Sequence, residues 1–125
     1  MKLEQLTYDI RAAAFAVHSE LGPGLLESAY ESCLVYELQE RRFRVSRQVL
    51  LPLHYKGVAM GNGYRTDLIV NQTVLLELKS VKFLEPIHRA QVLTYLRLSG
   101  LSIGLLINFN VLRLCDGIER LVHRL

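Results

Sequence analysis

The spacing of apolar residues changes once along the chain, and this change limits the folds that it can adopt. Before Phe43 they recur every three or four positions, which is typical of amphipathic helices. After Phe43 they tend to alternate with polar residues, which is typical of strands. We therefore predict helices over Thr7–Leu21 and Leu25–Arg42, with Thr7 as the N-cap of the first.

The part after Phe43 predicts three strands, one helix and a final buried strand. Pro86 and Gly100 bound the helix, because proline is favoured at the first helical position and glycine just past the last. Ser102–Phe109 is apolar and uncharged, so we expect a central strand there. Asp116-Gly117 is a two-residue hairpin signal. The other predicted strands are Val45–Tyr55, Tyr64–Val70 and Val74–Val81, with a turn region over Lys56–Gly63.

The order helix, helix, strands, helix, strand predicts an α/β fold with a mixed central sheet flanked by helices. With 125 residues, the chain is long enough for a single domain, residues 1–125, with a sizeable core. No apolar run approaches the ~18 residues that a membrane span needs. Glu4 and Asp9 stand where a signal peptide would be basic and then apolar. We expect a cytoplasmic protein that does not contact the membrane.

Charge is unevenly distributed. Residues 1–42 hold four Lys/Arg and seven Asp/Glu, whereas residues 43–125 hold eleven and five. Eleven of the fifteen basic residues are Arg, whose planar guanidinium suits phosphate, so a nucleic-acid partner is permitted but not required. The two cysteines lack metal-ligand spacing, and we expect two buried thiols. One basic cluster could follow a nucleic-acid backbone, although a solvated helix end explains most of it: Arg41, Arg42, Arg44 and Arg47.

Two acids and a lysine fall on two neighbouring predicted strands: Asp67, Glu77 and Lys79. Phosphodiester hydrolysis needs a cation on the phosphate oxygens and an activated water, and Mg²⁺ or Mn²⁺ prefers oxygen ligands. We predict that Asp67, Glu77 and the Leu78 carbonyl bind the metal. Lys79 is the predicted catalytic group, which would hold the attacking water or balance charge on the pentavalent phosphate. The alternative is an ordinary strand with a solvated Glu-Lys face.

This hypothesis requires a particular loop between the two strands. A two-residue turn at Asn71-Gln72 would set Asp67 opposite Leu76 and send the two acids to opposite faces. A three-residue loop, Asn71–Thr73, or a bulge would set Asp67 opposite Glu77. The loop length therefore tests the site.

Other polar residues are candidates for the same site. Glu27, near the start of the second helix, either joins the metal or simply complements the helix dipole. Gln91 and Tyr95 lie four apart on one helix face, where they could position a phosphate or the attacking water. The alternative is that Tyr95 packs and Gln91 is solvated. Arg65 and Tyr30 complete the candidate substrate-binding set, although Tyr30 suits core packing better.

Four blocks follow one another along the chain: Gly24-Leu25-Leu26-Glu27-Ser28-Ala29-Tyr30, Gly63-Tyr64-Arg65-Thr66-Asp67-Leu68, Leu76-Glu77-Leu78-Lys79, and His88-Arg89-Ala90-Gln91 through Tyr95-Leu96. They resemble the PD-(D/E)XK nuclease superfamily, and more closely its GxxExxY family, over roughly residues 7–120. The resemblance implies a restriction-endonuclease-like core and divalent-metal-dependent phosphodiester hydrolysis. It assigns Asp67 and Glu77 to the metal, Lys79 to catalysis and Glu27 to the metal shell. Gln91 and Tyr95 match a Gln-xxx-Tyr motif of an exonuclease branch.

The leading prediction is a nuclease that uses Mg²⁺ or Mn²⁺ and acts on nucleic acid, which we expect to be DNA. Its specificity would come from nucleic-acid structure or from a protein partner, because the chain has no room for a separate sequence-reading module. Cutting both strands of a duplex would be easiest for a two-fold homodimer. The alternatives are a binding or regulatory module that keeps the fold without useful catalysis, and a purely structural partner protein.

Overall fold

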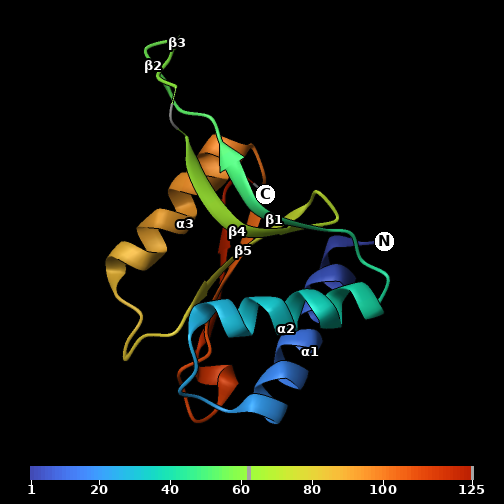
Figure 1. The fold of residues 1–125 in the computed structure, drawn as a ribbon. Helices are drawn as coiled ribbons and strands as arrows, with labels where there is room; N and C mark the ends of the chain where they lie inside the picture. The colour runs from blue at the N-terminus through green and yellow to red at the C-terminus, as the bar shows by residue number, and fades with distance from the viewer. Residues whose placement is uncertain (62, 125) are drawn as a thin grey trace.

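A five-stranded mixed sheet with helices on both faces forms the body of the protein in a computed structural model, which describes residues 1–61 and 63–124 (Figure 1). The strand order is β1-β4-β5-β6-β7, in which β5 and β6 run parallel and the other neighbours antiparallel. The prediction of a mixed α/β fold is therefore confirmed. The helices are α1 (Leu3–Leu21), α2 (Glu27–Glu40) and α3 (Pro86–Ser99), and the sheet strands are β1 (Val45–Leu51), β4 (Tyr64–Val70), β5 (Val74–Lys79), β6 (Ile103–Asn108) and β7 (Ile118–Val122).

The helices α1 and α2 cover one face of the sheet and α3 covers the other. Neighbouring residues of one strand point to opposite faces, so Leu76 packs in the core with α1 and α2 whereas Leu75 packs under α3. In β6, Leu105 and Leu106 divide in the same way. Both strands are apolar almost throughout because both of their faces are buried, as is usual for parallel strands.

Helix α3 connects the parallel strands β5 and β6 and lies close against the sheet. Its predicted ends are confirmed: Pro86 is at its start and Gly100, with φ 77°, is its C-cap. Gly104 permits the close approach, because a Cβ there would stand 2.9 Å from a Val92 methyl group and 3.3 Å from the Leu75 carbonyl oxygen.

Some predicted boundaries are wrong for identifiable reasons. Helix α1 begins at Leu3, and Thr7 lies inside it, where its hydroxyl donates to the Leu3 and Glu4 carbonyls instead of capping the helix. The strand predicted over Val45–Tyr55 ends at Leu51, before Pro52. A separate two-stranded hairpin follows: β2 (His54–Tyr55) forms from the end of the predicted strand, and β3 (Val58–Ala59) lies in the predicted turn region.

The C-terminal part also departs from prediction. Asp116-Gly117 is not a two-residue hairpin, because Asp116 ends a short 3-10 helix, η1 (Leu114–Asp116), and the Asn108 N–H donates to the Gly117 carbonyl across a longer connection. Cys115 is exposed and Cys33 half-buried, so the prediction of two buried thiols is wrong. No helix among residues 1–61 and 63–124 is long and apolar enough to span a membrane.

Candidate active site

The loop between β4 and β5 has the length that the site hypothesis requires. Three residues, Asn71–Thr73, separate the strands, and the observed pairing includes Leu68 opposite Leu76. Continued by one residue, this register sets Asp67 opposite Glu77. The alternative of a two-residue turn, which would have sent the acids to opposite faces, is excluded.

Beyond Leu68 the regular pairing of β4 with β5 stops, and two carboxylates take its place. The backbone N–H of Asp67 donates to Glu77 Oε1 over 2.9 Å, and the N–H of Leu78 donates to Asp67 Oδ2 over 2.8 Å. Each acid therefore holds the backbone of the opposite strand. This reciprocal arrangement, called here the carboxylate bridge, fixes both acids on rigid strands and not on a loop.

Two polar side chains orient the bridge. Thr66, which is fully buried, donates its hydroxyl to Glu77 Oε1 over 3.0 Å. Gln48 donates to Asp67 Oδ1 over 3.3 Å and to Glu31 Oε1 over 2.7 Å, so its amide lies between two carboxylates. The backbone of Gln48 is left-handed, with φ 48°, a conformation that costs a non-glycine residue roughly 1–2 kcal/mol.

Glu31, on α2, anchors this support. It is only 9% exposed, and its Oε2 accepts hydrogen bonds from Arg47 Nη2 at 3.0 Å and Arg47 Nε at 3.2 Å. Its negative charge is also one of the influences that raise the pKa of Asp67. Glu31 is therefore the acid on α2 that is connected to Asp67, through the Gln48 amide that donates to both.

Burial raises the proton affinity of both bridge acids. Burial, followed by the charge of Asp67, raises the pKa of Glu77 to about 7. Burial is also the main cause of the raised pKa of Asp67, whereas the hydrogen bond from the Leu78 N–H lowers that pKa. Two negative charges thus share a poorly solvated space, and a divalent cation would neutralise them. Mg²⁺ suits such a pair, because it is often held by one or two carboxylates with waters and substrate phosphates.

Lys79 lies on the same strand face as Glu77, two residues further along β5. It is half-buried, and its carbonyl accepts the Phe109 N–H over 3.0 Å, which ties the end of β5 to the end of β6. Its positive charge lowers the pKa of both Asp67 and Glu77. In the part of the chain that the structure describes, its ammonium forms no ion pair within 4.0 Å, so it is free to meet an anion.

Helix α3 supplies an aromatic wall beside the acids. The Tyr95 ring is 6.1 Å from that of Tyr64, at an interplanar angle of 35°. Burial and then the charges of Glu77 and Asp67 raise the pKa of Tyr95, which places its phenol within electrostatic reach of the bridge. Gln91 lies one turn earlier on the same helix face and is partly exposed.

The remaining candidates do not join the bridge. Glu27 is exposed at the start of α2, and the described residues contain no group of three or more His, Cys, Asp or Glu placed to hold one metal ion. The metal role of Glu27 stays a prediction. Tyr30 is fully buried and stacks on Phe109 at 4.5 Å, so the prediction that it contacts substrate is corrected to core packing. Arg65 is exposed on β4, two residues before Asp67.

Three supporting residues were not predicted from the sequence. Glu31 follows Glu27 by one helical turn, and this spacing could have identified it. Thr66 would point away from Asp67 in a regular strand, so its contact with Glu77 depends on the opening of the strand pair. Gln48 gives no sequence signal, because its role follows from an unusual backbone angle.

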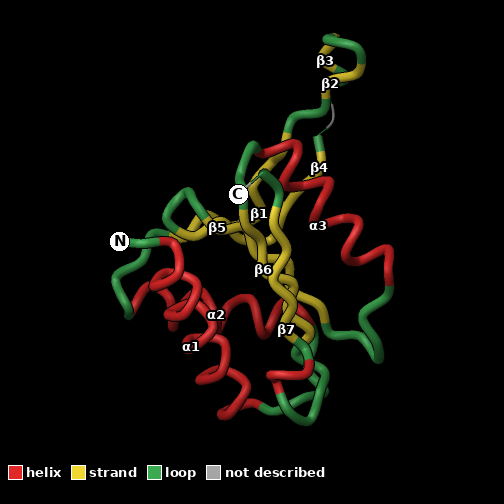
Figure 2. Tube along the Cα trace, turned by 180° about the vertical axis from the view of Figure 1, so that it is seen from behind, coloured by secondary structure: helices red, strands yellow, loops and turns green. Residues whose placement is uncertain are grey.

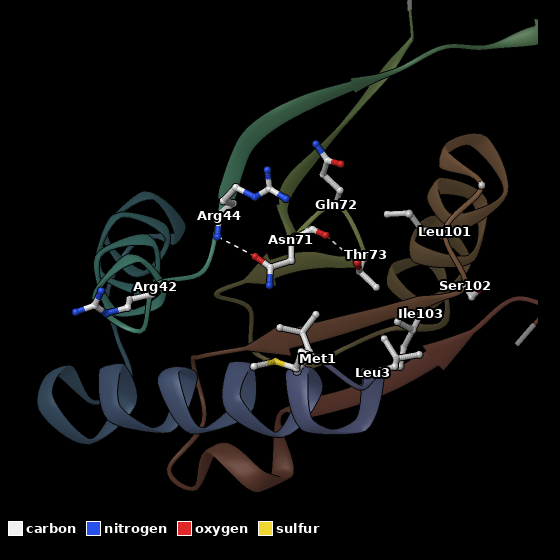
Figure 3. A pocket seen from close by; sticks show the side chains of 12 residues that line it. Met1, Leu3, Arg42, Arg44, Asn71, Gln72, Thr73, Leu101, Ser102 and Ile103 are labelled. Carbon is white, nitrogen blue, oxygen red and sulfur yellow. Dashed lines mark hydrogen bonds between the residues drawn. The ribbon is translucent and has the colours of Figure 1, made fainter.

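One cavity lies away from this chemistry, at the other end of β4 and β5 (Figure 3). It has a volume of about 650 Å³ and lies between the Asn71–Thr73 loop, the start of α1 and the segment that enters β6. Arg42 and Arg44 border it, and the described residues that line it include no acid. Size does not identify the catalytic centre here, because the acids needed for metal chemistry are at the opposite end of the strands.

The comparisons with known proteins gave one match. The model of the PD-(D/E)XK nuclease superfamily matches residues 4–121, from the first turn of α1 into β7. The matched span includes the carboxylate bridge and Lys79. No curated protein and no solved structure matches the chain. The mixed sheet flanked by three helices agrees with the restriction-endonuclease-like core that the sequence resemblance implied.

Proposed function

The chain belongs to the PD-(D/E)XK nuclease superfamily, and from that premise we propose that it hydrolyses phosphodiester bonds of DNA with Mg²⁺ or Mn²⁺ as cofactor. The observation that carries this proposal is the carboxylate bridge between Asp67 and Glu77, with Lys79 on the same strand face. An ordinary solvated strand face would not hold two acids in a poorly solvated space where burial raises the pKa of both.

Asp67 and Glu77 would hold the cation, and the Leu78 carbonyl is the proposed third protein ligand. When bound, the cation would supply Lewis-acid stabilisation of the phosphate oxygens and a water of lowered pKa. Thr66 and Gln48 keep the two carboxylates in place. The chain therefore contributes oriented oxygen ligands whose mutual repulsion favours a divalent cation over none.

The remaining side chains act on the substrate. The Lys79 ammonium stabilises negative charge that develops on the phosphate, where a fixed charge is most effective. The Gln91 amide and the Tyr95 phenol donate hydrogen bonds to a phosphate oxygen or to the attacking water. Arg65 contacts the backbone of the bound strand, since its guanidinium is exposed two residues before Asp67.

Within the superfamily we assign the chain to the GxxExxY family, in which we propose that two of the motif residues have structural roles. The Tyr30 hydroxyl donates to the Gly22 carbonyl over 2.6 Å and accepts the Leu25 N–H, and thereby closes the turn between α1 and α2. Gly24 has φ 102°, which favours glycine. The motif would thus fix the start of α2, the helix that carries Glu31.

Calorimetry of Mn²⁺ binding tests the metal site most directly. Wild type is compared with Asp67→Asn, which keeps an oxygen for the Leu78 N–H but removes the charge. We expect binding to be lost in Asp67→Asn and kept in the matched control Asp116→Asn, whose acid lies in η1. Equal Mn²⁺ binding by Asp67→Asn and wild type would overturn the assignment.

Cleavage is tested with end-labelled single-stranded and duplex DNA in Mn²⁺ or EDTA. We expect Lys79→Ala to lose about 10²–10³-fold in rate, the usual effect of removing one transition-state charge partner. Cleavage that persists in EDTA, or is unchanged in Lys79→Ala, would contradict the mechanism. Concerted cutting of both duplex strands would further require a two-fold dimer.

A second candidate function is a nucleic-acid-binding module without catalysis. It is favoured by one observation: among the described residues no third acid, His or Cys completes a metal-binding group with Asp67 and Glu77. DNA binding that persists in EDTA, without cleavage in Mg²⁺ or Mn²⁺, would support this candidate. A search for a protein partner would then follow.

A further inference from the structure

The β2–β3 hairpin projects from the body of the protein as a separate arm (Figure 1, Figure 2). Its strands pair with each other and not with the main sheet. Lys56 and Gly57, with φ 51° and 79°, form its two-residue turn, and the Met60 N–H donates to the Leu53 carbonyl at its base. All four strand residues of the arm are exposed, so burial in the core does not explain it.

The arm exposes large apolar side chains close together. Tyr55 is 61% exposed, Val58 60% and Met60 52%. Single exposed apolar residues are common on protein surfaces, but a group of them on a projecting element indicates a surface that binds something. The Lys56 ammonium lies 5.4 Å from the centre of the Tyr55 ring, so the tip presents an aromatic ring and a cation together.

The charge of this part of the chain indicates what it binds. Between Glu40 and Asp67 the sequence holds six Lys or Arg residues and no acid. Two of the six are paired, Arg41 with Glu37 and Arg47 with Glu31. The other four form no ion pair within 4.0 Å in the described part of the chain. Arg42 and Arg44 lie at the far end of β1, beside the Asn71–Thr73 loop, whereas Lys56 is at the tip of the arm and Arg65 is on β4, where the chain returns from it.

The arm is also continuous with the candidate active site. The chain returns from it into β4 at Tyr64, which is 52% exposed and faces Tyr95. Asp67 follows three residues later. A polyanion that lies on the arm therefore reaches the carboxylate bridge without crossing the protein, and an acidic protein surface would not need the exposed rings.

We propose that the β2–β3 arm binds single-stranded nucleic acid, with the Tyr55 ring stacked on a base and the Lys56 ammonium on the neighbouring phosphate. Stacking of bases on aromatic side chains contributes about 1–3 kcal/mol per base and needs a base that is not already paired. The arm thus selects unpaired segments for the nearby acids. This inference rests on the proposed function only in taking nucleic acid as the substrate that the nearby acids cleave.

The test measures binding of a fluorescent 12-nucleotide oligo(dT) by anisotropy in EDTA, where metal-dependent cleavage is absent. We expect Tyr55→Ala to weaken binding about tenfold, within the range for one stacked base. Tyr55→Phe, which keeps the ring, should bind as wild type does. Tyr8→Ala is the matched control, because Tyr8 is a 69% exposed tyrosine on α1.

Two further measurements separate the outcomes. Lys56→Gln should reduce the slope of log affinity against log salt by about 0.7, the value for one phosphate contact on a single strand. Equal affinity for wild type, Tyr55→Ala and Lys56→Gln would overturn the proposal, as would a change in sedimentation that shows the arm joining two copies. The two hypotheses fail separately: wild-type protein that binds oligo(dT) through Tyr55 but neither binds Mn²⁺ nor cleaves DNA would support the arm and contradict the proposed function.

Discussion

The two ends of the β4–β5 pair use the same strands for opposite purposes. At the loop end, regular pairing holds apolar side chains such as Leu68 and Leu76, both fully buried. At the other end, pairing stops and the carboxylates of Asp67 and Glu77 hold the strands. Stability is concentrated where packing is apolar, and this allows two repelling charges to be kept where chemistry is needed.

The largest effect on stability should come from the loop end. Leu76→Ala removes a fully buried side chain from the core under α1 and α2, and we expect it to lower the free energy of unfolding by about 2–5 kcal/mol. Urea denaturation measures this. Asp67→Asn, at the open end, should change the free energy of unfolding by less than about 1 kcal/mol, because a neutral amide oxygen still accepts the Leu78 N–H. Comparable losses in both variants would contradict the division.

The open end should instead show a strong dependence on pH. The pKa of Glu77 is raised from 4.5 to about 7, so its contribution to stability is fully present below pH 4.5 and is lost as the pH rises through about 7. In EDTA, we expect Glu77→Gln to match wild type near pH 4 and to exceed it by up to about 3 kcal/mol at pH 8. Urea denaturation across this range measures the difference.

Metal should reverse that ranking. At pH 8, saturating Mn²⁺ should stabilise wild type, by about 4.1 kcal/mol at a thousandfold excess over the dissociation constant, and should stabilise Glu77→Gln much less. EDTA should remove the gain. The same pH dependence of the free energy of unfolding for wild type and Glu77→Gln in EDTA would contradict the raised pKa of Glu77, and with it the effect of burial and of the Asp67 charge.

How much of this arrangement could be predicted depends on the range of the interactions. The pairing of the two acids was predicted only on the condition of a three-residue loop or a bulge, because a shift of one residue would have sent the acids to opposite faces. The three-residue loop is observed. The ends of α3 followed from Pro86 and Gly100, which act locally. These features are confirmed because their causes lie within a few residues of sequence.

The support of the site could not be predicted in the same way. Gln48 reaches Asp67 only because β1 pairs with β4 and because its own backbone is left-handed. Glu31 was overlooked in favour of Glu27, since both lie near the start of α2 and only packing determines which one turns toward β1. The arm was not predicted as a separate hairpin, because its two strands are only two residues each: the first was assigned to the end of a longer strand and the second to a turn region.

Gln48 should affect the chemistry more than the stability. In Gln48→Gly, relief of the left-handed backbone, about 1 kcal/mol, offsets part of the two lost hydrogen bonds, each about 1 kcal/mol. We expect Mn²⁺ affinity to fall about 10–100-fold, as is usual when a group that orients a metal ligand is removed. Calorimetry measures the affinity. Unchanged Mn²⁺ binding would show that Asp67 needs no support from β1.

The smallest expected effect comes from the matching glutamine at the loop end. Gln72 is also left-handed, with φ 56°, but it is exposed and its side chain donates no hydrogen bond to the acids. Gln72→Gly should raise the free energy of unfolding by about 0.5–1 kcal/mol, because glycine adopts this conformation without strain. Mn²⁺ affinity should not change. Both substitutions relieve a left-handed backbone. Only Gln48→Gly also removes an amide that holds Asp67, so only Gln48→Gly should lower the Mn²⁺ affinity. A fall in Mn²⁺ affinity as large as that of Gln48→Gly would mean that the whole strand pair, and not the open end, positions the carboxylates.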